Sequence, residues 1–283
     1  MLRRAVRSLL RPGRRLLLLY LALLALSHLV TDVILHRSPP PPGPAHGAIR
    51  SYVSVPAFND AGAVDGRITR LAYLRWRAQR PTDQPRPPII LLHGSPSGGA
   101  SDFADLGPLL ADHGYPVYAI DLPGFGESAR YAPSYSIIAN ARLTLAFMDA
   151  LEIPRAHLIG WSLGGGAIIY ADDFAPERVA SLTLLASVGA QESEGSGDYY
   201  FEHAKYAVGY FFLVVLPELV PHFGALGPRE LRHAFIRNFW DTDQRPVREI
   251  MERIETPTLI LHGRRDPLVP AWGAELHYEI IQP

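Results

Sequence analysis

A serine lies between two glycines in the segment "HLIGWSLGGGAI", His157 to Ile168. Gly160 to Gly164 match the G-x-S-x-G pattern, in which a serine on a sharp turn between a strand and a helix is a nucleophile for acyl transfer. An apolar run precedes Ser162 and a helical pattern follows it, and Gly160 and Gly164 are expected to give the close turn its room. The alternative is a glycine-rich turn without catalysis, because short motifs also occur by chance.

Acyl transfer also needs hydrogen-bond donors for the carbonyl oxygen that becomes negative. With this serine motif, one donor is the backbone N–H after the serine, here that of Leu163. The second comes from the loop after an earlier strand, and we predict the N–H of Ser95 in "HGSPSGG". His93 and Gly94 are expected to support this loop. His93 precedes the serine, whereas the catalytic base is expected to follow it in the chain.

Four segments together resemble the α/β-hydrolase superfamily, and within it the capped serine hydrolases similar to proline iminopeptidases and carboxylesterases. They are "HGSP" at 93–96, "DLPGFGES" at 121–128, "GWSLGG" at 160–165 and "TPTLILHGRRDPLVP" at 256–270. The resemblance implies a small-molecule acyl substrate and an acyl-enzyme on Ser162, with no metal and no organic cofactor. It favours an ester, with a thioester, amide or carbon–carbon bond as alternatives.

The same resemblance places the catalytic acid at Asp266, where it would orient a histidine and stabilise its protonated form. Asp266 could instead serve only as a helix-capping or turn residue before Pro267. Glu192 and Glu194 are alternative acids, because some esterases of the superfamily take their acid from that earlier loop. Asp121 is not expected to be catalytic, since it precedes the serine in the chain.

The catalytic base is the difficulty. The resemblance places a histidine after a final strand well beyond the acid, but only 17 residues follow Asp266 and His277 is the one histidine among them. We expect His277 to be a surface or packing residue on a helix with Trp272, Leu276 and Ile280 on one face. We therefore expect a truncated sequence whose final strand and base are missing. The alternative is a complete, non-catalytic binding protein on the same fold.

Short aliphatic runs alternate with helical patterns, which predicts an α/β fold with a mostly parallel sheet flanked by helices. The aliphatic runs are typical of strands buried on both faces. An aromatic-rich segment at about 191–250 predicts a helical cap inserted over an edge of the sheet. The expected strands are 51–55, 68–78, 87–94, 115–124, 156–160, 179–187 and 256–263, and the expected helices are 134–151 and the segment after the serine.

The N-terminal region, 1–37, combines arginines with an apolar run from Leu16 to Leu35, and predicts a membrane anchor. Positive residues stay on the cytoplasmic side, so the hydrolase domain at 49–283 should be extracytoplasmic. The alternatives are a signal cleaved near "ALS" at 25–27, giving a secreted protein, and a mis-started reading frame. Residues 38–48 are proline-rich and predict a stiff linker.

Composition excludes several classes of function. The net charge is −1 with no internal basic patch, so nucleic-acid binding is not expected. The chain has no cysteine, which removes disulfides, thiolate metal sites and thiol catalysis. No obligatory protein partner is indicated by any feature of the sequence.

Overall fold

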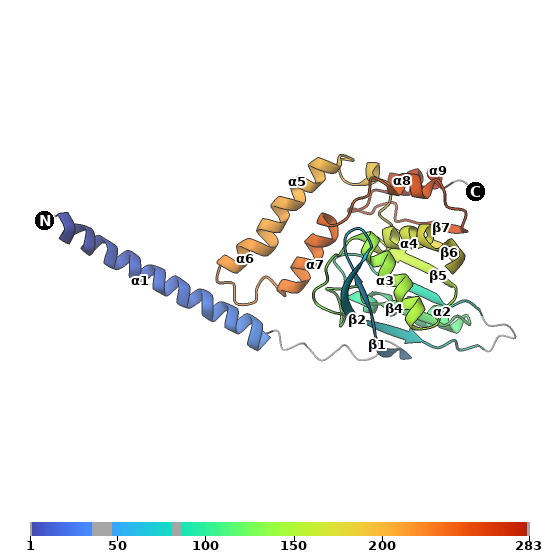
Figure 1. Ribbon diagram of the computed structural model, residues 1–283, viewed down its shortest axis with the longest axis horizontal. Helices are drawn as coiled ribbons and strands as arrows, with labels where there is room; N and C mark the ends of the chain where they lie inside the picture. Colours follow the sequence, from blue (N-terminus) through green and yellow to red (C-terminus); the bar gives the residue numbers. More distant parts are fainter. Residues whose placement is uncertain (1, 36–46, 81–85, 282–283) are drawn as a thin grey trace.

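A computed structural model describes residues 2–35, 47–80 and 86–281. These residues form one seven-stranded sheet in the order β1-β2-β4-β3-β5-β6-β7 (Figure 1). The strands are β1 (Ile49–Phe58), β2 (Val64–Trp76), β3 (Ile89–Leu92), β4 (Val117–Ile120), β5 (Ala156–Trp161), β6 (Val179–Leu185) and β7 (Thr258–Leu261). β2 pairs antiparallel with both β1 and β4, and the other pairs are parallel. The mostly parallel α/β sheet expected from the sequence is confirmed.

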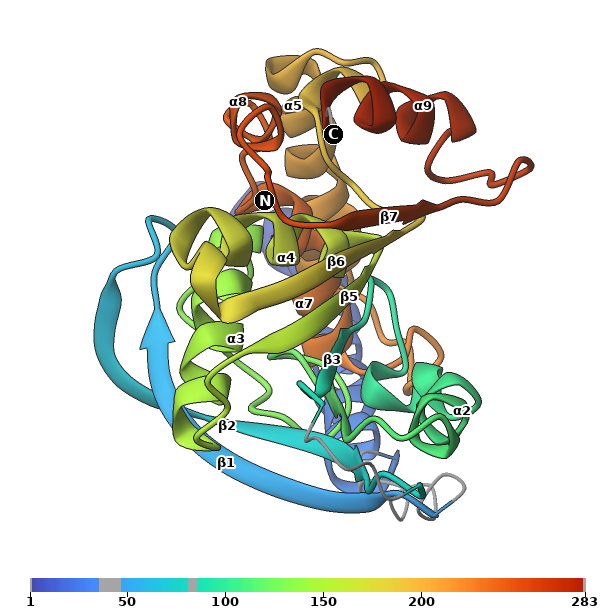
Figure 2. The same cartoon turned by 90° about the vertical axis from the view of Figure 1, so that its right-hand side faces the viewer.

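The central strands are buried on both faces, which explains their uninterrupted aliphatic runs. Ile90 and Leu92 of β3 belong to the hydrophobic core beneath α3 (Ile137–Ala150) and α4 (Leu163–Phe174). Ile89 and Leu91 belong to a second core beneath η3 (Gly99–Phe103) and α2 (Leu106–Asp112), on the opposite side of the sheet (Figure 2). Successive residues of β3 enter opposite cores because the side chains of a strand point alternately to the two faces of the sheet. The helix α2 was not predicted from the sequence.

β7 departs from the prediction of a strand buried on both faces. It pairs with β6 on one side, and no described residue pairs with its other side. Leu259 and Leu261 are 52% and 46% exposed, whereas Thr258 and Ile260, which alternate with them, are half-buried. A strand at the edge of a sheet lacks the neighbouring elements that would cover it, which is why its apolar side chains reach the surface.

The chain between β6 and β7 forms the cap, and α9 follows β7. Within the cap, α5, η6 and α6 make one continuous helical rod with α7 beside it (Figure 1). Asn238 of α7 donates a hydrogen bond to Ser95 Oγ at 2.9 Å, so the cap covers the carboxyl ends of the central strands. The helices of the cap are η5 (Gln191–Ser193), α5 (Tyr199–Tyr210), η6 (Phe211–Val215), α6 (Leu216–Leu219), α7 (Arg229–Trp240) and α8 (Val247–Met251). Outside the cap, η4 (Pro176–Arg178) precedes β6, and the helix after β7 is α9 (Ala271–Ile280).

A long N-terminal helix, α1 (Leu2–Leu29), projects from the body of the molecule and ends in the π-helical turn η1 (Val30–Leu35) (Figure 1). By length and composition, Gly13–Val33 is the one helical stretch among the described residues that could cross a membrane. The expected proline-rich linker lies almost wholly outside the described residues.

Candidate active site

Ser162 is the single residue between the end of β5 and the start of α4. Its backbone has φ 52° and ψ −117°, a region that residues other than glycine rarely adopt. The Ser162 N–H donates to the Leu185 carbonyl at 2.9 Å, and its own carbonyl accepts from Gly165 and Val188 at 2.9 and 3.2 Å. Hydrogen bonds to neighbouring segments therefore hold the strained turn, and the Ser162 hydroxyl stands at the carboxyl end of β5.

The positions around Ser162 must be glycine because a side chain there would clash with neighbouring atoms. A Cβ on Gly160 would lie 2.4 Å from the Gly164 carbonyl oxygen, and one on Gly164 would lie 2.4 Å from the Leu92 carbonyl oxygen. A Cβ on Gly94 would lie 2.9 Å from the Ser162 Cβ. A side chain at Gly160 or Gly164 would thus meet backbone atoms, which cannot move away cheaply. The structure brings these three glycines and Ser162 together.

Two backbone N–H groups near this turn have no hydrogen-bond acceptor among the described residues. Leu163 is the first residue of α4, so its N–H has no carbonyl four residues earlier within the helix. Ser95 directly follows Gly94, which touches Ser162, and its N–H donates to no described group. Its hydroxyl instead accepts the hydrogen bond from Asn238. Free N–H groups beside a nucleophile are the groups that bind a developing oxyanion.

His93 is buried, and both of its ring nitrogens are occupied. The Leu122 N–H donates to Nε2 at 2.9 Å, so Nε2 is the acceptor and Nδ1–H donates to the Gly94 carbonyl at 2.7 Å. Burial lowers the pKa of the His93 ring, which keeps it neutral. His93 therefore ties the loop after β3 to the loop after β4 and leaves no nitrogen for the Ser162 proton.

Asp121 is likewise occupied in a structural network. Its carboxylate pairs with Arg50 at 2.6 Å and accepts the N–H groups of Ala100 and Glu127 at 2.5 and 2.9 Å. The Asp121 side chain is fully buried. These contacts join β1 to the loops after β3 and β4. They explain why a carboxylate is buried at this position without assigning it a catalytic role.

Asp266 lies in the loop after β7. Its Oδ1 accepts hydrogen bonds from the backbone N–H groups of Leu268 and Val269 at 2.9 and 3.0 Å. These two bonds hold the pKa of the Asp266 carboxyl below its ordinary value. Asp266 Oδ2 accepts no hydrogen bond from a described residue. The carboxylate is therefore ionised and oriented, with one oxygen free.

No described histidine forms a hydrogen bond to Ser162 Oγ. His277 is buried on α9, where its Nε2 accepts from the Ala190 N–H at 3.3 Å and lies 3.4 Å from Ser193 Oγ. Burial lowers the pKa of His277 to about 4. The predicted packing face of this helix is wrong in part, because Trp272 is 47% exposed while His277 is inside. The ring fills the space over Gly189, which has no side chain.

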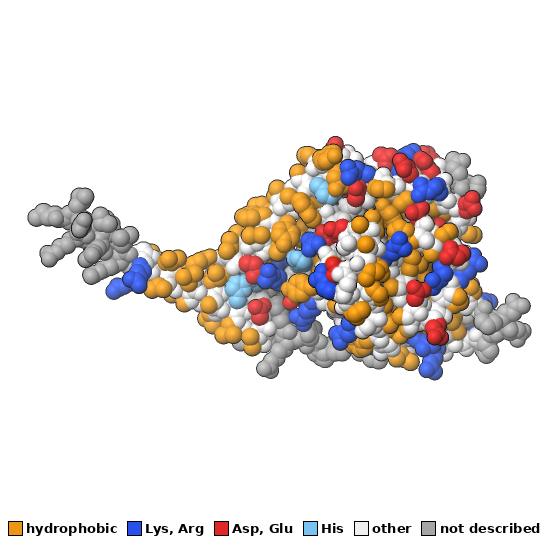
Figure 3. All heavy atoms as spheres, in the orientation of Figure 1, with side chains coloured by type: hydrophobic (Ala, Val, Ile, Leu, Met, Phe, Trp, Pro, Cys, Tyr) orange, Lys and Arg blue, Asp and Glu red, His pale blue; other side chains and the backbone are white. Residues whose placement is uncertain are grey.

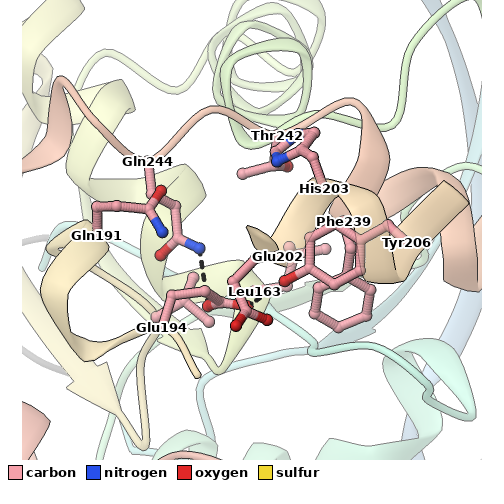
Figure 4. Close-up of a pocket in the computed structure, with 10 residues that line it drawn as sticks. Leu163, Gln191, Glu194, Glu202, His203, Tyr206, Phe239, Thr242 and Gln244 are labelled. Carbon is pink, nitrogen blue, oxygen red and sulfur yellow. Dashed lines mark hydrogen bonds between the residues drawn. The ribbon is translucent and has the colours of Figure 1, made fainter. Parts of the chain in front are cut away.

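A narrow cavity of about 10 Å³, close to the room that one water molecule needs, lies between Leu163 and the cap. Glu194 stands at its side, where Tyr206 donates to Oε1 at 2.6 Å and Gln244 donates to Oε2 at 2.8 Å (Figure 4). Burial, and then the Glu194 charge, raise the pKa of Tyr206, so its hydroxyl stays protonated. The cavity is lined by Leu163, Val188, Gln191, Glu194, Glu202, His203, Tyr206, Phe239, Thr242 and Gln244.

The alternative acids thus have other partners in the structure. Both oxygens of Glu194 are taken by cap residues, and Glu192 is exposed and pairs with Arg248 at 2.8 Å. The sequence did not single out Tyr206 or Gln244 as site residues. They come from separate cap segments, and no spacing rule connects residues that meet only through tertiary packing.

Comparison with known proteins gives the family and the fold. The sequence model of the alpha/beta hydrolase fold matches residues 87–237. A putative non-heme haloperoxidase of Mycobacterium phage D29 is 31% identical over 205 residues, which are 65% of this chain and 73% of that protein. A pimeloyl-(acyl-carrier protein) methyl ester esterase of Neisseria meningitidis is 29% identical over 67% of this chain and 65% of its own length.

Among solved structures, a bacterial membrane phospholipase A superposes with a TM-score of 0.60 at 23% identity, covering 100% of this chain and 88% of that chain. At this identity the likeness concerns the fold. Other curated relatives are matched along shorter parts of their length, down to 28%.

Proposed function

Because the chain belongs to the alpha/beta hydrolase fold family, we propose that it is a serine hydrolase that cleaves a carboxylic ester through an acyl-enzyme on Ser162. The observation that carries the proposal is the strained Ser162 turn at the end of β5, beside the free N–H groups of Leu163 and Ser95. A glycine-rich turn without catalysis would have no need of a non-glycine residue at φ 52°.

The proposed reaction runs in two steps. Ser162 Oγ attacks the carbonyl carbon and gives its proton to a base, while the carbonyl electron pair moves onto oxygen, where the N–H groups of Leu163 and Ser95 hold it. The ester C–O bond then breaks, and the leaving alkoxide takes the proton from the base. Water then attacks the acyl-enzyme and gives a proton to the same base, the bond between Ser162 Oγ and the acyl carbon breaks as Oγ takes that proton back, and the carboxylic acid leaves.

The base is the open position of this scheme. No described histidine forms a hydrogen bond to Ser162 Oγ, so the base is unassigned among the described residues, and the free Oδ2 of Asp266 is the group that we propose to orient it. The missing contact also favours a second candidate, a non-catalytic protein that binds an acyl ligand in the cavity under the cap.

A fluorophosphonate probe separates the two candidates, because it reacts with an activated serine and not with an ordinary one. In the protein extended through any coding sequence that follows Pro283, we expect labelling that is lost in Ser162→Ala and retained in His277→Gln, since His277 is a packing residue. Absence of labelling in that folded protein would refute the hydrolase and leave the binding protein.

We further propose that α1 anchors the protein in a membrane with the hydrolase domain on the extracytoplasmic side, and that the substrate is a lipid-like or aromatic ester. The apolar stretch Gly13–Val33 supports the anchor, and the likeness to a solved membrane phospholipase A accords with it. N-terminal sequencing of the exported protein tests the anchor: a chain that begins after residue 27 would instead support a cleaved signal.

A further inference from the structure

The helical rod of the cap, α5 to α6, carries an apolar stripe on its outer face. The stripe residues follow one another at intervals of mostly three and four, which places them along one side of a helix. The large ones are 38–58% exposed. Lys205, whose side chain is half exposed, lies on the same rod and pairs with Glu202. The stripe consists of Phe201, Val208, Phe211, Phe212, Val215 and Leu219.

Along α5 the inner side of the same rod is polar, whereas in η6 and α6 the buried residues are Val214 and Pro217. Glu202, His203 and Tyr206 line the cavity over Leu163, and Glu202 is only 3% exposed. A helix on the surface of a water-soluble protein has the opposite arrangement, with apolar residues inside and polar residues outside. The inverted pattern indicates that water is not the medium that the outer face contacts.

The exposed aromatic surface of the cap is comparable in area to the largest apolar patch of a soluble monomer. Five aromatic residues about half exposed, at 150–250 Å² each, present on the order of 500 Å². That area already matches the largest apolar patch of a typical monomer, about 300–600 Å². Figure 3 shows hydrophobic side chains continuing from α1 along the neighbouring edge of the cap. The aromatic residues are Tyr200, Phe201, Phe211, Phe212 and Phe223, which are 41–73% exposed.

The tip of the cap, residues 218–223, is hydrogen-bonded to the end of α1. The buried Ser27 Oγ accepts the backbone N–H groups of His222 and Phe223 at 2.8 and 2.7 Å, and His28 Nε2 lies 3.1 Å from the Glu218 carbonyl oxygen. Ser27 is six residues before the end of the candidate span Gly13–Val33. Six residues are about 9 Å of helix. The tip therefore sits at the depth, about 5–10 Å, at which interfacial helices bury their apolar faces.

We propose that the apolar stripe and the tip of the cap are a second membrane-contacting surface, seated in the phospholipid interface beside α1. This inference rests on the proposed anchoring by α1 and is independent of whether Ser162 is catalytic. It identifies the partner of the cap as a lipid bilayer.

The absence of cysteine from the chain allows a direct test. Single-cysteine variants of the full chain carry an environment-sensitive fluorophore and are reconstituted in phosphatidylcholine vesicles. Val208→Cys and Phe212→Cys report the stripe, Leu23→Cys reports α1, and Ile68→Cys on β2, which is 70% exposed, is the matched control away from the cap. In the vesicles we expect the fluorescence intensity to rise severalfold and the emission to shift to the blue at the stripe and at α1, and we expect doxyl-labelled lipid to quench this fluorescence. At Ile68 we expect neither the intensity nor the emission wavelength to change.

If lipid shields the fluorophore at Leu23 while the fluorophores on the stripe are in water, the inference is wrong, although the proposed anchoring by α1 still holds. Fluorophores in water at both places would overturn the anchor as well. A blue shift at the stripe that doxyl lipid does not quench indicates contact with a second copy of the chain and also overturns the inference. The fluorophosphonate experiment reports on Ser162 separately.

Discussion

Replacing Ser162 with glycine should stabilise the protein. The observed φ of 52° and ψ of −117° cost a non-glycine residue about 1–3 kcal/mol, and glycine adopts them freely. Glycine loses more conformational entropy on folding, about 0.5–1 kcal/mol. The Ser162 hydroxyl forms no hydrogen bond with a described residue, so its removal adds little. The relieved strain minus the entropy loss predicts that Ser162→Gly raises the free energy of unfolding by about 1 kcal/mol.

The matched control is Ser162→Ala, which removes the hydroxyl but keeps the Cβ and the strain. At about 2–4 °C per kcal/mol for a domain of this size, Ser162→Gly should melt a few degrees above Ser162→Ala. Tryptophan fluorescence of the full chain in detergent follows the transition, because all four tryptophans lie after the N-terminal helix. Equal melting temperatures for the two variants would show that the turn at Ser162 is not strained, and with it the main argument for a nucleophile would fall.

Three further substitutions test the packing around the site. Gly164→Ala should cost about 1–3 kcal/mol in denaturant unfolding because its Cβ meets a β3 carbonyl, whereas Gly263→Ala, with open space around it, should be nearly neutral; equal effects would contradict this. Below pH 6.5 the unfolded His277 gains a proton that the folded ring, with a pKa of about 4, does not, so stability should fall by up to about 3 kcal/mol between pH 6.5 and 4. His277→Gln should flatten that pH profile, and an unchanged profile would show that another group causes it. Asp121→Asn should cost about 3 kcal/mol because Arg50 loses its fully buried partner and keeps only the partly exposed Glu127, and a shift in denaturant midpoint equivalent to under about 1 kcal/mol would refute this.

The order of strands and helices was predictable because each element is specified locally. The runs "IILL" and "VYAI" are apolar at every position, and this pattern occurs in strands covered on both faces. The helix after residue 134 was predicted slightly long, since it begins at Ile137, where Ser136 caps it by accepting the Ala139 N–H. The short α2 was missed because seven residues give too little periodicity.

The site was predictable in part for the same reason. Ser162 and Leu163 are neighbours in the chain, so one motif specifies both. The cavity above them depends on Glu194, Tyr206 and Gln244, which are brought together by the packing of separate cap segments. Their contacts depend on the approach of the cap to the sheet.

By itself, the sequence determined the strand-turn-helix around Ser162 and the apolar character of the N-terminal helix, because both follow from short-range spacing and hydrophobicity. Only the tertiary structure decided that the cap helix turns its apolar stripe outward and fastens its tip to Ser27. An amphipathic helix has the same sequence whichever face meets the core, and its orientation is set by the partners that surround it. Here those partners are the polar cavity on one side and α1 at the tip.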